Sequence, residues 1–177
     1  MDRVTELALA ARDGNRHALE EFVRVTQRSV WLLCRHLGDP DTVEDLVQDT
    51  YLRALRSLPR FRNDGPARAW LLRIARNTCA DATRSRIRRR RRMAEGEAPD
   101  TPVVSGSWEV VEDLLRGISA ERREAFVLTQ FVGLSYAEAA AVAGCAVGTI
   151  RSRVSRARED LLALLDDETR GATGSSG

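Results

Sequence analysis

The spacing of apolar residues is the feature of this sequence that most constrains its fold. Through most of the chain these residues recur every three or four positions, the period of one face of an α-helix, and no segment alternates as a strand does. Turn residues punctuate this pattern, for example at Gly38-Asp39-Pro40. The pattern predicts an all-α fold, with helices at about 4–11, 19–37, 41–58, 67 into the arginine run that follows, 107–116, 120–132, 136–143 and 147–165.

One segment breaks the helical period. Residues 93–107 collect proline, glycine and acidic residues, a composition typical of a linker. The sequence therefore predicts two small helical domains joined by an acidic flexible linker. The expected boundaries are a first domain over 1–92, the linker over 93–113, a second domain over 114–165 and a disordered tail over 166–177.

Charge is distributed unevenly over these segments. The 28 basic and 26 acidic residues leave a net charge of only +2, yet residues 60–92 hold 12 arginines and two acids, a block of +10. Residues 93–125 hold three arginines and eight acids, a block of −5. All the basic residues are arginine, which fits both the codon bias of a GC-rich genome and selection for the planar guanidinium that binds phosphates and guanines. The basic block, rather than the missing lysine, indicates a polyanionic partner.

Several classes of function lack the residues they need. Three dispersed cysteines and two histidines give neither a disulfide framework nor a metal site, and no phosphate-binding loop or nucleophile elbow occurs. No stretch approaches the ~18 apolar residues of a membrane span. We therefore expect a protein of the reducing cytoplasm that is not an enzyme, needs no cofactor or metal and does not enter the membrane.

The helix that enters the basic block carries a row of donors. At 100° per residue, one face of it holds Arg73, Arg76, Asn77, Arg84 and Arg88. Five consecutive arginines, Arg88 to Arg92, then extend it, and their mutual repulsion favours a nucleic-acid partner. A solvated basic helix end is the alternative interpretation.

The loop before this helix, residues 61–68, combines an aromatic ring with turn residues and polar donors. Such a loop, beside a basic helix, is suited to holding an unstacked base. Phe61 and Trp70 are the candidate stacking rings, and a place in the hydrophobic core is the alternative for both.

Residues 135–158 have the spacing of a helix-turn-helix. Ser135 and Glu138 form an S-x-x-E capping box, and Gly144 stands where the first helix should end. The second helix would bury a stripe containing Ile150 and Val154. It would present small residues and arginines to the major groove. An ordinary helical hairpin is the alternative.

Three segments together resemble the extracytoplasmic-function (ECF, group 4) sigma factors of bacterial RNA polymerase. Residues 44–54 resemble that family's helix for docking on the polymerase β′ clamp helices, residues 70–77 its segment that reads and opens the −10 promoter element, and residues 148–158 its −35 reading helix. The resemblance covers about residues 5–165. It implies a subunit that binds core RNA polymerase and directs promoter-specific initiation.

The resemblance also implies roles for individual residues. The residues implied to dock on core polymerase are Asp45, Gln48, Asp49 and Arg53. Reading and melting at −10 falls to Phe61, Arg62, Asn63, Ala67, Arg73, Arg76, Asn77, Arg84 and Arg88. Reading at −35 falls to Thr149, Arg151, Ser152, Arg153, Ser155 and Arg156. The family often has a bulkier residue at Ser155 and proline at Ala146, so the base preference and the rigidity of the turn do not carry over.

The implied partners are promoter DNA and core RNA polymerase, through its β′ clamp helices and its β flap; whether an anti-sigma factor exists is left open. The acidic linker would thread the polymerase channels, or lie against the Arg84–Arg92 run in the free protein. An autonomous helix-turn-helix repressor or activator with a basic arm remains the competing function.

Overall fold

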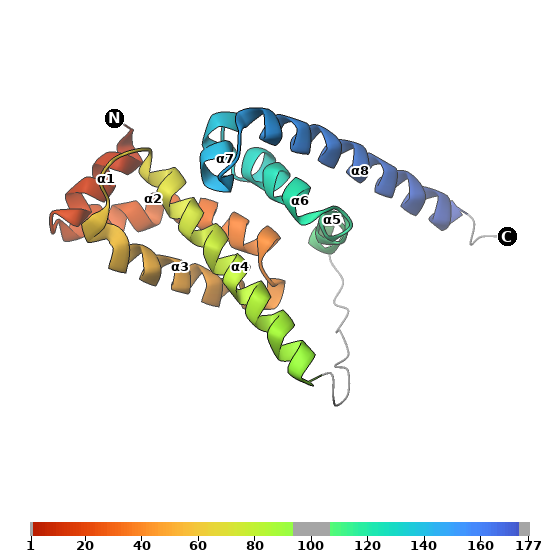
Figure 1. Ribbon diagram of the computed structural model, residues 1–177, viewed down its shortest axis with the longest axis horizontal. Coiled ribbons are helices and arrows are strands. Elements are labelled where there is room, and N and C mark those ends of the chain that lie inside the picture. The colour runs from red at the N-terminus through yellow and green to blue at the C-terminus, as the bar shows by residue number, and fades with distance from the viewer. Residues whose placement is uncertain (1, 94–106, 174–177) are drawn as a thin grey trace.

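The computed structural model describes residues 2–93 and 107–173, and these residues form helices joined by short turns, without a strand (Figure 1). The all-α prediction is confirmed. Bounds agree with the predicted segments to within a few residues except at the end of the last helix. The elements are α1 (Arg3–Arg12), α2 (Arg16–Leu37), η1 (Pro40–Thr42), α3 (Val43–Ser57), η2 (Leu58–Arg60), α4 (Ala67–Met93), α5 (Ser107–Arg116), α6 (Ala120–Phe126), the π-helical turn η3 (Val127–Phe131), α7 (Tyr136–Ala143) and α8 (Val147–Thr173).

Helices α1 to α4 form the first half of the molecule. Asp2 caps α1 and Asn15 caps α2, each accepting a hydrogen bond from a backbone N–H three residues later. Helix α2 ends at Gly38, where a Cβ would lie 2.6 Å from the Cys34 carbonyl oxygen. Only glycine lets the chain turn so tightly into α3.

Helices α5 to α8 form the second half. The predicted capping box is present, because Ser135 caps the N–H of Glu138 and the Glu138 carboxylate accepts from the N–H of Ser135. Gly144 ends α7 in the left-handed conformation, with φ +71°. The segment expected as one helix over 120–132 is α6 followed by η3, in which the N–H of Val132 donates to the carbonyl of Val127.

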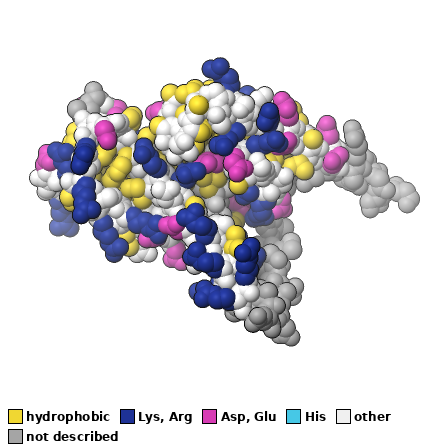
Figure 2. Space-filling view, viewed as in Figure 1, with side chains coloured by type: hydrophobic (Ala, Val, Ile, Leu, Met, Phe, Trp, Pro, Cys, Tyr) yellow, Lys and Arg dark blue, Asp and Glu magenta, His cyan; other side chains and the backbone are white. Residues whose placement is uncertain are grey.

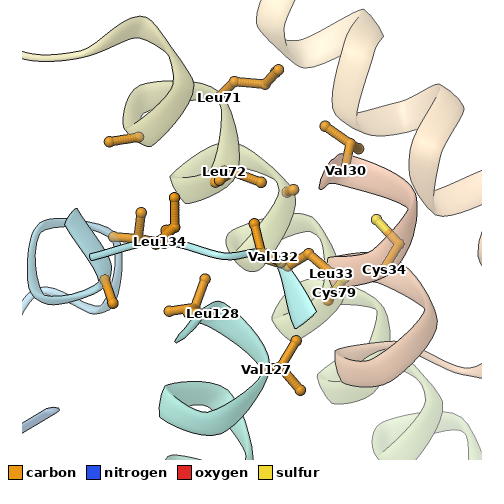
Figure 3. Packing of buried hydrophobic residues seen from close by; sticks show 14 of the residues in the cluster. Val30, Leu33, Cys34, Leu71, Leu72, Cys79, Val127, Leu128, Val132 and Leu134 are labelled. Atoms are coloured by element: carbon orange, nitrogen blue, oxygen red, sulfur yellow. The ribbon is translucent and has the colours of Figure 1, made fainter. Parts of the chain in front are cut away.

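The two halves share one hydrophobic core. Leu33 of α2 and Leu72 of α4 lie opposite Leu128 and Val132 of the second half (Figure 3). Helix α7 packs on α4, and η3 packs on α2. In this structure the two halves are therefore in direct contact, and α4 and α8 project beyond that contact in different directions (Figure 1).

Two predicted boundaries differ from the structure. The sequence predicts a linker that reaches residue 113, but residues 107–113 belong to α5, whose Val111 and Leu115 pack on the core. It predicts a tail from residue 166, but α8 continues through Gly171 to Thr173, and residues 166–170 contain neither glycine nor proline. Residues 94–106 and 174–177, with Glu95, Glu97 and Asp100 of the linker, lie outside the described residues.

Candidate nucleic-acid and polymerase interface

Helix α4 separates an apolar face from a polar one. Leu71, Leu72 and Ala75 are fully buried against the rest of the molecule. The expected DNA-facing residues Arg73, Asn77, Arg84 and Arg88 are exposed. Beyond them, Figure 2 shows arginine side chains gathered along the projecting end of the helix. The structure thus brings four of the expected residues to the surface of one helix.

Carboxylates already engage some of the α4 arginines. Asp81 accepts hydrogen bonds from Arg84 at 2.6 Å and from Arg53 of α3 at 2.6 Å, and these partners lower the pKa of Asp81. Arg86 pairs with Asp39. Within the described residues, no ion pair joins Arg88–Arg92 to a carboxylate. The end of α4 is therefore the part of the helix with the most uncompensated positive charge.

Arg76 differs from the other expected −10 residues. Its guanidinium forms an ion pair with Glu124 of α6, which is 8% exposed. A buried carboxylate needs such a partner, because desolvation without one is costly. Arg76 thus joins the two halves in this structure. DNA cannot take the place of Glu124 until that pair breaks.

The loop between η2 and α4 borders a surface pocket of about 570 Å³, lined by residues 60–62 and 64–66 together with Trp70 and Arg73. Arg62 and Asn63 are exposed at this loop, and Asn63 has the left-handed φ of 58°. Ala141 of α7 also lines the pocket, so the second half borders it.

Two expected −10 residues of this loop are structural. Phe61 is 4% exposed and packs on Trp70, with ring centroids 5.0 Å apart. Ala67 is fully buried, and its N–H donates to the Thr5 hydroxyl at 3.0 Å. In this arrangement both side chains are buried, so their expected role at DNA stays a prediction. Trp70, which is half-buried, borders both the pocket and the core.

Helix α8 carries the expected −35 residues. Ile150, Val154 and Ala157 are buried, as the apolar stripe predicted. The opposite side exposes Arg151, Ser152, Ser155 and Arg156, and Thr149 is half-buried. Arg153 departs from this face. It is half-buried, with Nη1 3.9 Å from the Cys145 sulfur in the turn.

Helix α3 carries the expected polymerase-docking residues. Asp45 and Gln48 are exposed, whereas Arg53 is held by Asp49 at 2.9 Å and by Asp81 at 2.6 Å. These pairs raise the pKa of Arg53. Arg53, one of the expected docking residues, therefore joins α3 to α4.

Sequence reasoning missed two apolar residues on this helix. Leu52 and Leu55 are 45% and 40% exposed. They lie near Gln48 by helical spacing. Their signal was present in the sequence, because both fall outside the buried stripe of α3.

Sequence reasoning also missed Arg68 and Glu124. Arg68 donates to the Ser29 hydroxyl at 3.0 Å and to the Val132 carbonyl at 2.7 Å, and so joins the two halves. Glu124 pairs with Arg76 across 48 positions of the sequence. No local pattern predicts such distant partners.

Two family models match the chain. Sigma-70 region 2 matches residues 22–92 and Sigma-70 region 4 matches residues 108–161. The chain is 46% identical to the ECF RNA polymerase sigma factor SigC of Mycobacterium tuberculosis over 180 residues, which cover 98% of this chain and 96% of SigC. The chain belongs to the ECF RNA polymerase sigma factors.

Other sigma factors are similar along nearly the whole chain. CnrH of Cupriavidus metallidurans is 37% identical over 95% of this chain and 96% of its own length. A solved structure of CnrH with the cytosolic domain of CnrY has a TM-score of 0.75 at 35% identity, covering 94% of this chain and 99% of that one. The RpoE sigma factor of Bartonella quintana, solved with the anti-sigma factor NepR, has a TM-score of 0.73 at 32% identity, covering 84% and 96%.

Membership in this family gives the function. A sigma factor binds core RNA polymerase and directs promoter-specific transcription initiation, and its family members are not enzymes. The competing interpretation as an autonomous repressor or activator is not favoured, because the chain matches both region 2 and region 4 of the sigma factors.

Two further observations concern membranes and metals. No helix in the described part of the chain is long and apolar enough to cross a membrane. Among residues 2–93 and 107–173, no three His, Cys, Asp or Glu side chains gather as a metal site.

Proposed function

We propose that this sigma factor reads its promoter with two helices, α4 at the −10 element and α8 at the −35 element, and docks on core polymerase through α3. The observation that carries the proposal is the exposed polar face of α4, where Arg73 lines the loop pocket and Asn77 is exposed one turn further along, while the opposite face is buried. We propose domain limits near those of the two family matches, with α5 assigned to the second domain.

At the −10 element, the pocket of the 60–66 loop would receive a base flipped from the non-template strand. Asn77 would hydrogen-bond that base or its neighbour, and Arg62, Asn63 and Arg73 would hold the adjoining backbone. Capturing an extruded base offsets a few kcal/mol of unstacking, so binding energy rather than ATP would open the duplex. Phe61 would support this pocket from beneath instead of stacking on the base, because Trp70 covers its ring.

At the −35 element, the exposed face of α8 would lie in the major groove. Small residues at Ser152 and Ser155 let the helix approach the bases closely, and arginine is the most common specific reader of guanine there. Arg151 and Arg156 are the two readers on this face. Arg153 would instead support the turn through its contact at Cys145.

The partners follow from the same surfaces. The β′ clamp helices would dock on Asp45, Gln48 and Asp49 with the exposed Leu52 and Leu55, and the β flap would bind the second domain. An anti-sigma protein is a further proposed partner, because CnrH and RpoE were solved with CnrY and NepR and share this fold. We place the protein in the cytoplasm, where core polymerase acts, and assign it no catalytic activity.

The packing of the two halves restricts access to the proposed −10 surface. Arg76 pairs with Glu124, and Ala141 borders the −10 pocket. We propose that α6 and α7 move away from α4 before Arg76 reaches DNA.

The −10 assignment is tested with Asn77→Ala. The template carries a promoter identified by run-off transcription from genomic fragments. On the duplex template the activity of this variant should fall at least about tenfold, the scale of one base-specific hydrogen bond. On a template melted in advance its activity should fall less. The matched control is Arg28→Ala, since Arg28 is exposed on α2 outside the proposed surfaces. Equal activity of Asn77→Ala and the control on duplex template would remove Asn77 from the −10 site.

A further inference from the structure

A small cavity of about 20 Å³ lies between the two halves, at the end of α2. One side consists of Arg35, His36 and the turn at Gly38 and Pro40. The other side consists of α5 and the start of α6. The residues of that side are Glu112, Leu115, Arg116 and Arg123. This volume exceeds the ~10–15 Å³ needed for one water-sized species.

The charges around this cavity are not balanced. Three arginines line the cavity with one carboxylate, that of Glu112, which is 6% exposed. The Oε1 of Glu112 is ion-paired with Arg35 but has no hydrogen-bond partner in the described part of the chain. Glu112 pairs with Arg35 and, at 3.5 Å, with Arg116, which also pairs with Asp113. Arg123 has no carboxylate partner among the described residues, and its Nε is buried without a hydrogen-bond acceptor. Arg123 as a whole is half-buried, but a buried N–H such as its Nε–H is costly without an acceptor, unless a species within the cavity accepts from it.

His36 adds a second donor. It is 5% exposed and packs against Phe131 of the second half, with ring centroids 4.3 Å apart and the ring planes tilted by 49°. Neither ring nitrogen has a hydrogen-bond partner in the described part of the chain. Burial and the charge of Arg35 lower the pKa of His36 to about 4, so the ring is neutral near pH 7 and carries one N–H.

Both uncompensated groups respond to positive charge. Burial and then the charge of Arg116 lower the pKa of Arg123, as burial and then Arg35 lower that of His36. A water molecule would accept a hydrogen bond but leave the positive charge unbalanced. An anion would accept the hydrogen bond and also balance the charge.

We propose that this cavity binds a small inorganic anion, held by the guanidinium of Arg123 and the N–H of His36. Arg35 and Arg116, at the same cavity, add to the positive potential and form ion pairs with Glu112. The site is completed by both halves, because Arg35 and His36 come from α2 whereas Arg116 and Arg123 come from α5 and α6. The anion therefore stabilises the packed arrangement and is released when the halves separate.

Bromide locates the site directly. Crystals of the whole chain soaked in sodium bromide should show an anomalous peak within hydrogen-bond reach of Arg123 Nε. Density that refines as water there, with no anomalous peak, would overturn the proposal.

Chloride tests the same site in solution. Thermal unfolding is measured at equal ionic strength in sodium chloride and in sodium gluconate, whose anion is too large for the cavity. At chloride twenty times its dissociation constant, the folding equilibrium constant should rise about 20-fold over that in gluconate. Arg123→Gln should abolish this difference, and the control Arg28→Gln, with the same loss of charge, should keep it. A chloride effect that is unchanged in Arg123→Gln would contradict the proposal. If that variant does not fold, the bromide experiment on the unaltered chain is the deciding test.

Discussion

Helices α4 and α8 both present arginines on an exposed face, yet their surroundings differ. On α4, Arg76 and Arg84 pair with Glu124 and Asp81. On α8, Arg151 and Arg156 are exposed without an ion pair in the described chain. The proposed −35 face is thus free in the packed arrangement, whereas Arg76 of the proposed −10 face is occupied by the second half of the molecule. On this proposal we expect binding at −10 to depend on the arrangement of the halves and binding at −35 not to depend on it.

The largest effect is expected at the end of α4. Replacing Arg88–Arg92 with glutamine should weaken promoter binding by about a hundredfold or more, and should reduce the salt slope by up to ~0.9 for each phosphate that the helix no longer neutralises. Binding of the polymerase complex to promoter DNA at several salt concentrations measures this. If affinity falls as expected but its salt slope is unchanged, the arginine run does not contact DNA.

On α8, a single reader should affect one base position. Arg156→Ala should cost ~1–3 kcal/mol at one position of the −35 element, because the variant has no guanidinium to bind guanine through two hydrogen bonds. Binding to a set of −35 variants measures it. If the cost is equal on all variants, Arg156 binds phosphate rather than a base.

The dependence on domain arrangement is tested at Glu124. Glu124→Gln should weaken its pair with Arg76 by ~1.5–3 kcal/mol, the range for a hydrogen bond to a charged group. Binding of a single-stranded −10 oligonucleotide should therefore increase about tenfold, with a longer distance between fluorophores on the two halves. The control is Glu121→Gln, an exposed acid of the same helix. Increased oligonucleotide binding without a change of distance would show that Glu124 acts only through charge.

The smallest effect is expected at the proposed docking face of α3. It should not depend on which promoter element, −10 or −35, is tested. Replacing Leu52 and Leu55 with serine should weaken binding to core polymerase about fivefold, because the smaller polar side chains bury less apolar surface, a difference of ~1 kcal/mol. Titration of labelled sigma factor with core enzyme measures it, with Ile87→Ser, at an exposed position of α4, as control. A defect that appears only in DNA binding would move these leucines out of the docking face.

The sequence predicted what depends on neighbouring residues. Periodicity located the helices, the capping box at Ser135 was present, and the buried stripe of α8 through Ile150 and Val154 agreed with the structure. Local patterns could not predict Arg76 with Glu124 or Arg35 with Glu112, because these partners lie far apart in the chain. Phe61 was ambiguous for the same reason, since only packing against Trp70 decides that its ring is buried.

Core-dependent promoter opening tests the account most directly. Permanganate reactivity of unpaired thymines, together with run-off transcription, is measured on genomic fragments with the sigma factor alone, with core polymerase alone and with both. The account predicts reactive thymines at the −10 element and a defined transcript only when both are present. Promoter opening or specific duplex binding by the chain alone, with no core-dependent transcript from any fragment, would contradict it.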